Sequence, residues 1–165
     1  MSVRAGVFSP HPEDIMESNN KWDARFLRLA QVVSSWSKDP STKVGAAIVR
    51  DDHTLVSVGY NGFPRGCDDD VALYEDRPTK YMRTVHAEVN AILTAREPVV
   101  GCTLYVWPLH PCAACTGVII QSGIKRVVAY MKDEPGQWAE QFNAARKMCE
   151  EAGIKITTVQ TLGDA

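Results

Sequence analysis

The feature that most constrains the fold of this chain is the alternation of helical and extended segments after residue 85. Apolar spacing and helix stops predict a helix at 86–96, a strand at 102–108, a helix at 112–123, a strand at 125–130, a helix at 136–153 and a strand at 154–161. A helix between two strands returns the chain to the starting end of the sheet, so the strands become parallel neighbours. The second half of the chain therefore predicts a parallel sheet covered by helices.

The first half adds a helix and a hairpin. Apolar residues at helical spacing predict a helix over 21–37, followed by Pro40. Two apolar segments at 44–50 and 54–60 predict strands joined by a turn. Residues 61–80 begin with a Gly-, Pro- and Asp-rich stretch and predict a poorly ordered loop. The fold class is thus α/β: a three-layer α/β/α sandwich with a five-stranded mixed sheet.

Length and charge limit the possible domain organisation and partners. A chain of 165 residues fits one domain, which we expect at 21–161, with an N-terminal arm at 1–20 and a tail at 162–165. The net charge of −2 argues against a nucleic-acid partner. The sequence has neither an apolar run of membrane-spanning length nor a signal-peptide pattern, which predicts a cytoplasmic protein with no membrane partner.

Two short motifs at predicted helix starts carry the chemistry. His86 opens one helix with Glu88 two residues later, and Cys112 and Cys115 open another after Pro111. Helix N-termini stabilise thiolates, and one imidazole with two thiolates suits zinc. Three protein ligands leave one position for a catalytic water, whose proton the Glu88 carboxylate could receive.

Each motif alone has other interpretations. The cysteine pair could be a redox pair or two core thiols; a disulfide is disfavoured by five cysteines in a reducing compartment. A fourth protein ligand would close the zinc and indicate a non-enzymatic binding module. Cys67, Cys102, His53 and His110 are the spare candidates, but none shares the motif spacing. The two motifs together, each at a helix start with a strand between them, favour a catalytic zinc.

His-x-Glu followed by Pro-Cys-x-x-Cys matches the signature of zinc-dependent deaminases, in which the glutamate moves protons and is not a ligand. Around these motifs the chain resembles deoxycytidylate (dCMP) deaminases, within the cytidine deaminase-like superfamily, over about residues 21–160. The segments that carry the resemblance are SKDPSTKVGAAIV (37–49), GYNGFPRGCDDD (59–70), TKYMRTVHAEVNAIL (79–93) and IIQSGIKRVV (119–128).

The resemblance implies hydrolytic deamination of dCMP to dUMP with release of ammonia, which supplies dUMP for thymidylate synthesis. It implies one catalytic Zn²⁺ per subunit and a homo-oligomer, often a hexamer. It also implies activation by dCTP and inhibition by dTTP, with Mg²⁺ accompanying the regulatory nucleotide. The alternative is a deaminase of another cytosine nucleoside or nucleotide, such as cytidine, dCTP or a modified dCMP.

The resemblance also implies roles for individual residues. His86, Cys112 and Cys115 would hold zinc, and Glu88 would protonate N3 of the base and then the departing amine. The other implied contacts are the Ala87 N–H to the base O2, Asn61 to the sugar, Pro111 beside the substrate, and Gly62, Phe63, Pro64 and Arg65 at the regulatory or the active site.

A 5′-phosphate requires cationic or hydroxyl donors, which the segment STK (41–43) offers. Lys43 and Ser41 are the first candidates for this contact. Tyr130 and Arg83 are more distant candidates. Lys80 and Arg65 are further candidates, and the sequence does not distinguish these lysines and arginines from solvated ones.

Overall fold

In the computed structural model, residues 21–163 are described, so the predicted arm at 1–20 and the last two residues of the tail lie outside the described residues. The chain order of the elements is α1 (Lys21–Ser34), β1 (Gly45–Val49), β2 (Leu55–Tyr60), α2 (Val71–Glu75), α3 (Arg77–Arg83), α4 (Ala87–Thr94), β3 (Thr103–Trp107), α5 (Ala113–Ser122), β4 (Arg126–Tyr130), the 3₁₀-helix η1 (Gly136–Trp138), α6 (Ala139–Ala152) and β5 (Lys155–Val159). None of the described helices is long and apolar enough to cross a membrane.

The strands form one mixed sheet in the order β2-β1-β3-β4-β5. β1 runs antiparallel to both β2 and β3, and Ala46 lies opposite Gly59 on one side and Val106 on the other. β3, β4 and β5 are parallel to one another. The predicted five-stranded mixed sheet, with its parallel half in the second part of the chain, is confirmed.

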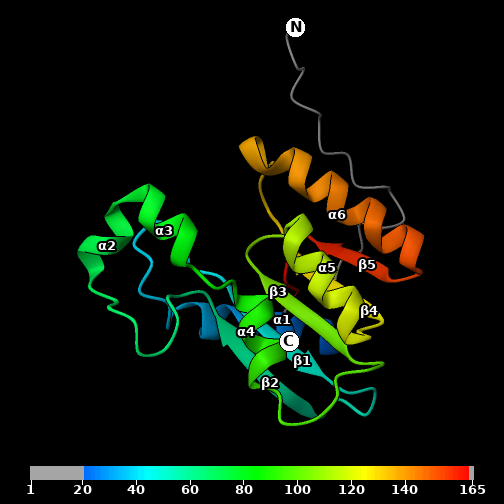
Figure 1. The fold of residues 1–165 in the computed structure, drawn as a ribbon. Helices are drawn as coiled ribbons and strands as arrows, with labels where there is room; N and C mark the ends of the chain where they lie inside the picture. Colours follow the sequence, from blue (N-terminus) through cyan, green and yellow to red (C-terminus); the bar gives the residue numbers. More distant parts are fainter. Residues whose placement is uncertain (1–20, 164–165) are drawn as a thin grey trace, which may run out of the picture.

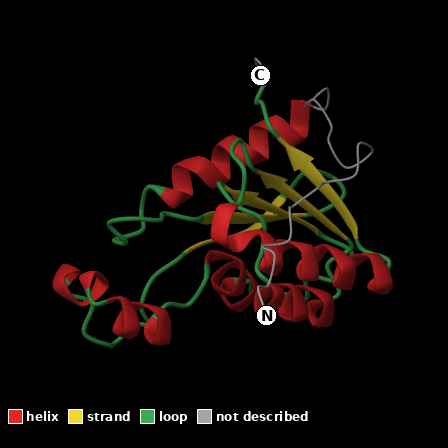
Figure 2. Cartoon of the chain, turned by 90° about the horizontal axis from the view of Figure 1, so that it is seen from above, coloured by secondary structure: helices red, strands yellow, loops and turns green. Residues whose placement is uncertain are grey.

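Alternate residues of β1 point to the two faces of the sheet and separate two apolar cores. Ala46 and Ile48 join a core that includes residues of α4 and α5. Ala47 and Val49 join a second core with residues of α1. The sheet therefore lies between α1 on one face and α4, α5 and α6 on the other, which confirms the three-layer sandwich (Figures 1 and 2).

Gly59 in β2 allows α4 to approach the sheet closely. A Cβ at this position would lie 2.3 Å from the Ala91 nitrogen and 2.4 Å from the Ala87 oxygen, both in the α4 backbone. Any side chain here would push α4 away from β2. Because His86 and Glu88 lie at the start of α4, this glycine also helps to fix their position.

The expectation of a poorly ordered loop over 61–80 is wrong, because its second half forms α2 and α3. The Asp70 side chain accepts a hydrogen bond from the Ala72 N–H at the start of α2. Asp76 accepts one from the Thr79 N–H at the start of α3, whose first turn also contains a proline. Capping aspartates and a first-turn proline are helix-start signals that the acidic, proline-containing composition concealed.

The α2–α3 hairpin lies to one side of the sheet in both views (Figures 1 and 2). Buried Tyr74 of α2 stacks on Phe63, with ring centroids 4.0 Å apart, and its hydroxyl accepts a hydrogen bond from the Phe63 N–H at 3.1 Å. This contact ties the hairpin to the loop that leaves β2.

Candidate active site

Three potential metal ligands meet where the first turns of α4 and α5 converge. His86 and Cys112 occupy the N-cap positions of these helices, and Cys115 lies in the first turn of α5. The His86 Nδ1 lies 3.6 Å from the Cys112 Sγ and 3.2 Å from the Cys115 Sγ. All three ligand atoms lie within 4.8 Å of one another.

The separations and the donor types fit zinc. Tetrahedral bonds of about 2.0–2.1 Å to nitrogen and about 2.3 Å to sulfur place neighbouring ligand atoms roughly 3.5 Å apart. Hydrogen bonding from Cys115 and from His86 lowers the pKa of the Cys112 thiol, and a thiolate is the form that binds a metal. Within residues 21–163, no other group of three such side chains is close enough to hold a metal, and none of the four spare candidates belongs to this one.

Glu88 lies in the first turn of α4, beside the three ligands. Its side chain is buried, and burial raises its pKa to about 7. A carboxyl group with a pKa near neutrality can both accept and donate a proton at physiological pH. Glu88 thus has the burial and the proton affinity that an acid–base group requires.

Glu88, His86 and Cys112 line a cavity of about 430 Å³, a volume typical of small-ligand sites. The walls come from the loop after α1, the start of β1, the end of β2, α3, the start of α4, the loop after β3, η1 and the start of α6. The remaining lining residues are Asp39, Ser41, Thr42, Val44, Asn61, Arg77, Lys80, Tyr81, Thr84, Ala87, Leu109, His110, Gln137, Trp138 and Phe142.

The sequence pattern of the cytidine and deoxycytidylate deaminase zinc-binding region matches residues 20–131. The chain belongs to this family. A protein from Aliivibrio fischeri described as an uncharacterized deaminase in the luxG 3′ region is 43% identical over 141 residues, which cover 84% of this chain and 93% of that one. Mouse deoxycytidylate deaminase is 40% identical over 140 residues, or 81% of this chain and 77% of the mouse protein.

The fold is also that of a solved member of the family. The crystal structure of dCMP deaminase from the cyanophage S-TIM5 superposes with a TM-score of 0.65 at 22% identity, covering 85% of this chain and 98% of the phage protein. With the sheet order and the helical layers above, this similarity confirms the cytidine deaminase-like fold expected from the sequence.

In this deaminase, several of the residues predicted from the sequence surround the cavity and several do not. Ser41, Asn61, Lys80 and Ala87 line it, together with Glu88 and two of the three ligands. The remaining candidates are not among its lining residues: Lys43, Pro111, Gly62, Phe63, Pro64 and Arg65. The Lys43 ammonium instead donates a hydrogen bond to the Ser37 carbonyl at 2.5 Å.

Asn61 is buried and organises the chain next to the cavity. Its Oδ1 accepts a hydrogen bond from the Val44 N–H at 2.8 Å, and its Nδ2 donates to the Thr42 carbonyl at 2.9 Å. These bonds fix the segment that connects the loop after α1 to β1. Asn61 therefore shapes the cavity wall whether or not it also contacts a ligand.

Apart from Lys80, sequence reasoning missed the cavity residues that α3 and the start of α6 contribute. Arg77, Tyr81 and Thr84 of α3 line the cavity, as do Trp138 and Phe142 at the start of α6. The α3 residues were overlooked because their segment was expected to be a loop. The helix-start signal at Asp76 and the following proline could have revealed them.

His110 lies in the loop after β3, two residues before Cys112. It is buried, its Nε2 lies 2.9 Å from the Thr158 Oγ1 of β5, and its ring packs against Phe142. It thereby connects the loop that carries the cysteines to β5 and to α6.

Proposed function

We propose that this protein catalyses the hydrolytic deamination of dCMP to dUMP with release of ammonia. The observation that carries the proposal is the placement of buried Glu88 beside three side chains with the donor set and spacing of a zinc site. The name of the mouse relative, deoxycytidylate deaminase, supports dCMP as the substrate.

His86, Cys112 and Cys115 are the residues that would hold one zinc ion, which supplies an activated water when it is bound. Glu88 accepts a proton from the attacking water and donates it to N3 of the cytosine ring. Protonation at N3 makes C4 electrophilic, so the C4–oxygen bond forms at this carbon. Glu88 then carries the second proton of the water to the amino group, the C4–nitrogen bond breaks and ammonia leaves.

Two further residues orient the base and the sugar in this proposal. The backbone N–H of Ala87 is one of the first in α4, which has no earlier carbonyl to bond within the helix, so it can donate to the base O2. Asn61, whose side-chain amide is held by backbone groups of the cavity wall, would lie beside the sugar.

The deciding experiment is steady-state deamination of dCMP, deoxycytidine and dCTP by the purified, zinc-loaded protein. We expect the highest kcat/KM with dCMP. A higher kcat/KM with deoxycytidine or dCTP would show that the substrate is another cytosine compound and not dCMP. Absence of turnover with all three would reject the proposal.

Regulation by dCTP and dTTP with Mg²⁺, in a homo-oligomer such as a hexamer, forms a separate part of the proposal. Residues 62–65, which are not among the residues that line the cavity, are the proposed contacts for the regulatory nucleotide. The same assays with added dCTP or dTTP test the regulation, and sedimentation of the protein tests the assembly. An unchanged rate with both nucleotides would discard the regulation and leave the enzyme.

A further inference from the structure

One face of α3 is turned toward the cavity and is polar. Arg77, Lys80, Tyr81 and Thr84 all line the cavity, at positions i, i+3, i+4 and i+7 of the chain. A helix face that packs on a protein core is normally apolar. The Thr84 hydroxyl donates to the Lys80 carbonyl at 2.6 Å. The two cations and the phenol on this face indicate that it meets a polar, anionic ligand.

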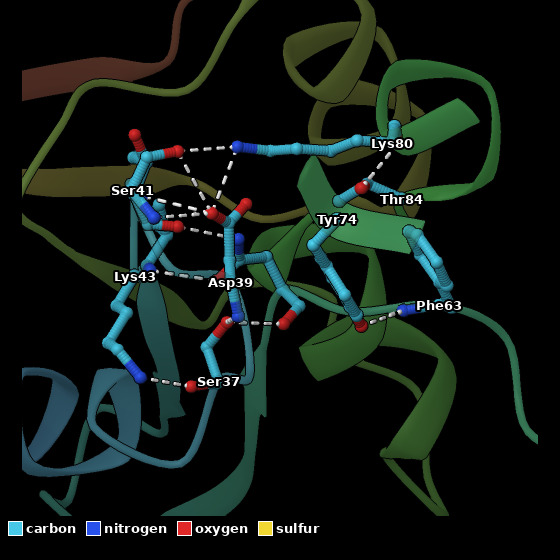
Figure 3. A network of polar contacts seen from close by, with 11 residues as sticks. Ser37, Asp39, Ser41, Lys43, Phe63, Tyr74, Lys80 and Thr84 are labelled. Atoms are coloured by element: carbon cyan, nitrogen blue, oxygen red, sulfur yellow. Dashed lines mark hydrogen bonds and ion pairs between the residues drawn. The ribbon is translucent and has the colours of Figure 1, made fainter. Parts of the chain in front are cut away.

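The first cation, Lys80, is held in place within the wall. Its side chain is buried, and its ammonium donates to the Asp39 Oδ1 at 2.9 Å and to the Ser41 Oγ at 2.6 Å (Figure 3). A lysine ammonium has three N–H donors. Among the described residues it has these two acceptors, so one donor remains for a ligand in the cavity.

The Asp39 carboxylate is held in place by the loop that carries it. Asp39 Oδ1 also accepts the Ser41 N–H at 2.9 Å, the Ser41 hydroxyl at 3.1 Å and the Thr42 N–H at 3.1 Å. The backbone of the 39–42 loop thus fixes the carboxylate, which in turn fixes the direction of the Lys80 side chain.

The second cation, Arg77, is exposed and lines the same cavity. Within residues 21–163 its guanidinium has no hydrogen bond or ion pair with another side chain or carbonyl. A guanidinium carries five donors in a planar arrangement that matches phosphate oxygens, often two at a time. Arg77 and Lys80 lie one helical turn apart, so both can reach one anion.

We infer that this face of α3 is the phosphate subsite, where Lys80 and Arg77 hold the 5′-phosphate of the nucleotide whose base lies at Glu88. The inference rests on the proposed function. It assigns the choice between nucleotide and nucleoside to the α2–α3 hairpin beside the sheet, and it assigns no phosphate contact to Lys43.

The test compares two substitutions that change charge equally on the same helix. Arg77→Gln removes a cation that lines the cavity, and Arg83→Gln removes an exposed cation of α3 that does not. We expect Arg77→Gln to lower the ratio of kcat/KM for dCMP to kcat/KM for deoxycytidine by roughly 10- to 100-fold. The same ratio should stay within about twofold for Arg83→Gln. Equal ratios in the two variants would overturn the inference.

Binding of inorganic phosphate, measured by calorimetry on the same proteins, tests the phosphate subsite separately from the proposed function. The wild-type protein and Arg83→Gln should bind phosphate with equal affinity, and Arg77→Gln and Lys80→Met should bind it more weakly. That pattern without deamination of dCMP would retain the subsite and reject the proposed function. Deamination of dCMP, together with phosphate binding that Arg77→Gln does not weaken, would retain the proposed function and reject the subsite. Arg77→Gln decides the result, because Lys80→Met also leaves Asp39 without its cation.

Discussion

Burial determines the chemistry available to Glu88. An exposed glutamate is ionised at pH 7 and is a poor proton donor, whereas burial raises the pKa of Glu88 to about 7. The same burial excludes solvent, which would otherwise compete for the transferred proton. In the proposed mechanism, the position of this side chain, two residues after His86, would combine proton affinity with proximity to the reacting atoms.

Replacing Glu88 with glutamine should therefore remove turnover without removing the metal site. Glutamine keeps the shape of the side chain but cannot accept the proton, so kcat for dCMP should fall at least about 100-fold. Zinc content, measured by elemental analysis, should stay at the wild-type value because His86, Cys112 and Cys115 are unchanged. Glu75→Gln, on the exposed surface of α2, is the control and should keep the wild-type activity. A Glu88→Gln variant as active as this control would contradict the proton-shuttle role.

Two ion pairs show how elements are joined, and burial distinguishes them. Buried Asp23 of α1 accepts two hydrogen bonds from the Arg126 guanidinium, at 2.9 and 2.6 Å, and one from the Tyr105 hydroxyl at 2.8 Å. It therefore links α1 to β3 and β4. The neighbouring Lys125 pairs with Asp51 at 2.5 Å, but both side chains of that pair are at least half exposed.

Asp23→Asn should lower the free energy of unfolding by about 2–4 kcal/mol, because it leaves the partly buried Arg126 without a counter-charge. Asp51→Asn makes the same change in an exposed pair and should cost less than about 1 kcal/mol. Urea unfolding of both variants measures the difference. Equal losses of unfolding free energy in the two variants would show that Asp23 does not join α1 to β3 and β4.

The ion pair between α3 and the 39–42 loop makes stability depend on pH. Burial raises the pKa of Asp39, but the hydrogen bonds from Lys80 and from the Ser41 and Thr42 N–H groups outweigh it, so the pKa lies below its ordinary value. A carboxyl group whose pKa is lowered by folding stabilises the native state above its unfolded pKa of about 3.9. This stabilisation disappears as the pH falls through the lower, folded value.

The stability difference between the wild type and Asp39→Asn should therefore be constant from about pH 5 to 7 and shrink below about pH 4. Urea unfolding of the two metal-free proteins across this range measures it, since zinc loss at acid pH then affects neither. A difference that grows as the pH falls would contradict the lowered pKa.

At the scale of the whole molecule, a bound metal would join helices that the sheet alone brings together. His86 begins α4, the two cysteines begin α5, and both helices pack on the same face of the sheet. An ion bound only by the folded chain stabilises it by mass action. Metal removal should therefore weaken the entire fold as well as end catalysis.

A chelator should lower the Tm of the zinc-loaded protein by about 5–10 °C, the effect of a ligand at 100 times its Kd on a domain of this size. Added zinc should restore it. Thermal unfolding followed by a fluorescent dye measures both steps, and Cys115→Ala should show no effect of the chelator. Loss of zinc without a change in Tm would argue against a site that bridges α4 and α5.

Local patterns were sufficient for the layers of the fold and for the metal-ligand cluster. Apolar periodicity defines a strand or a helix over a few residues, and helix starts at His86 and Cys112 place the ligands with little dependence on distant contacts. The parallel half of the sheet followed from its crossover helices alone. The segment at 61–80 was misjudged because its two helices are short and depend on capping aspartates and the Tyr74–Phe63 stack.

Two lysines show what the sequence could not predict and the tertiary structure decided. Lys43 and Lys80 are alike in sequence, each a cation near a predicted loop. In the folded chain Lys43 reaches the Ser37 carbonyl and Lys80 enters the cavity wall beside Asp39 and Ser41 (Figure 3). The sequence determined the helix-start chemistry of the metal cluster, because capping positions are local. Only the tertiary structure decided which cation faces the ligand space, because a long side chain is placed by partners that are distant in the sequence.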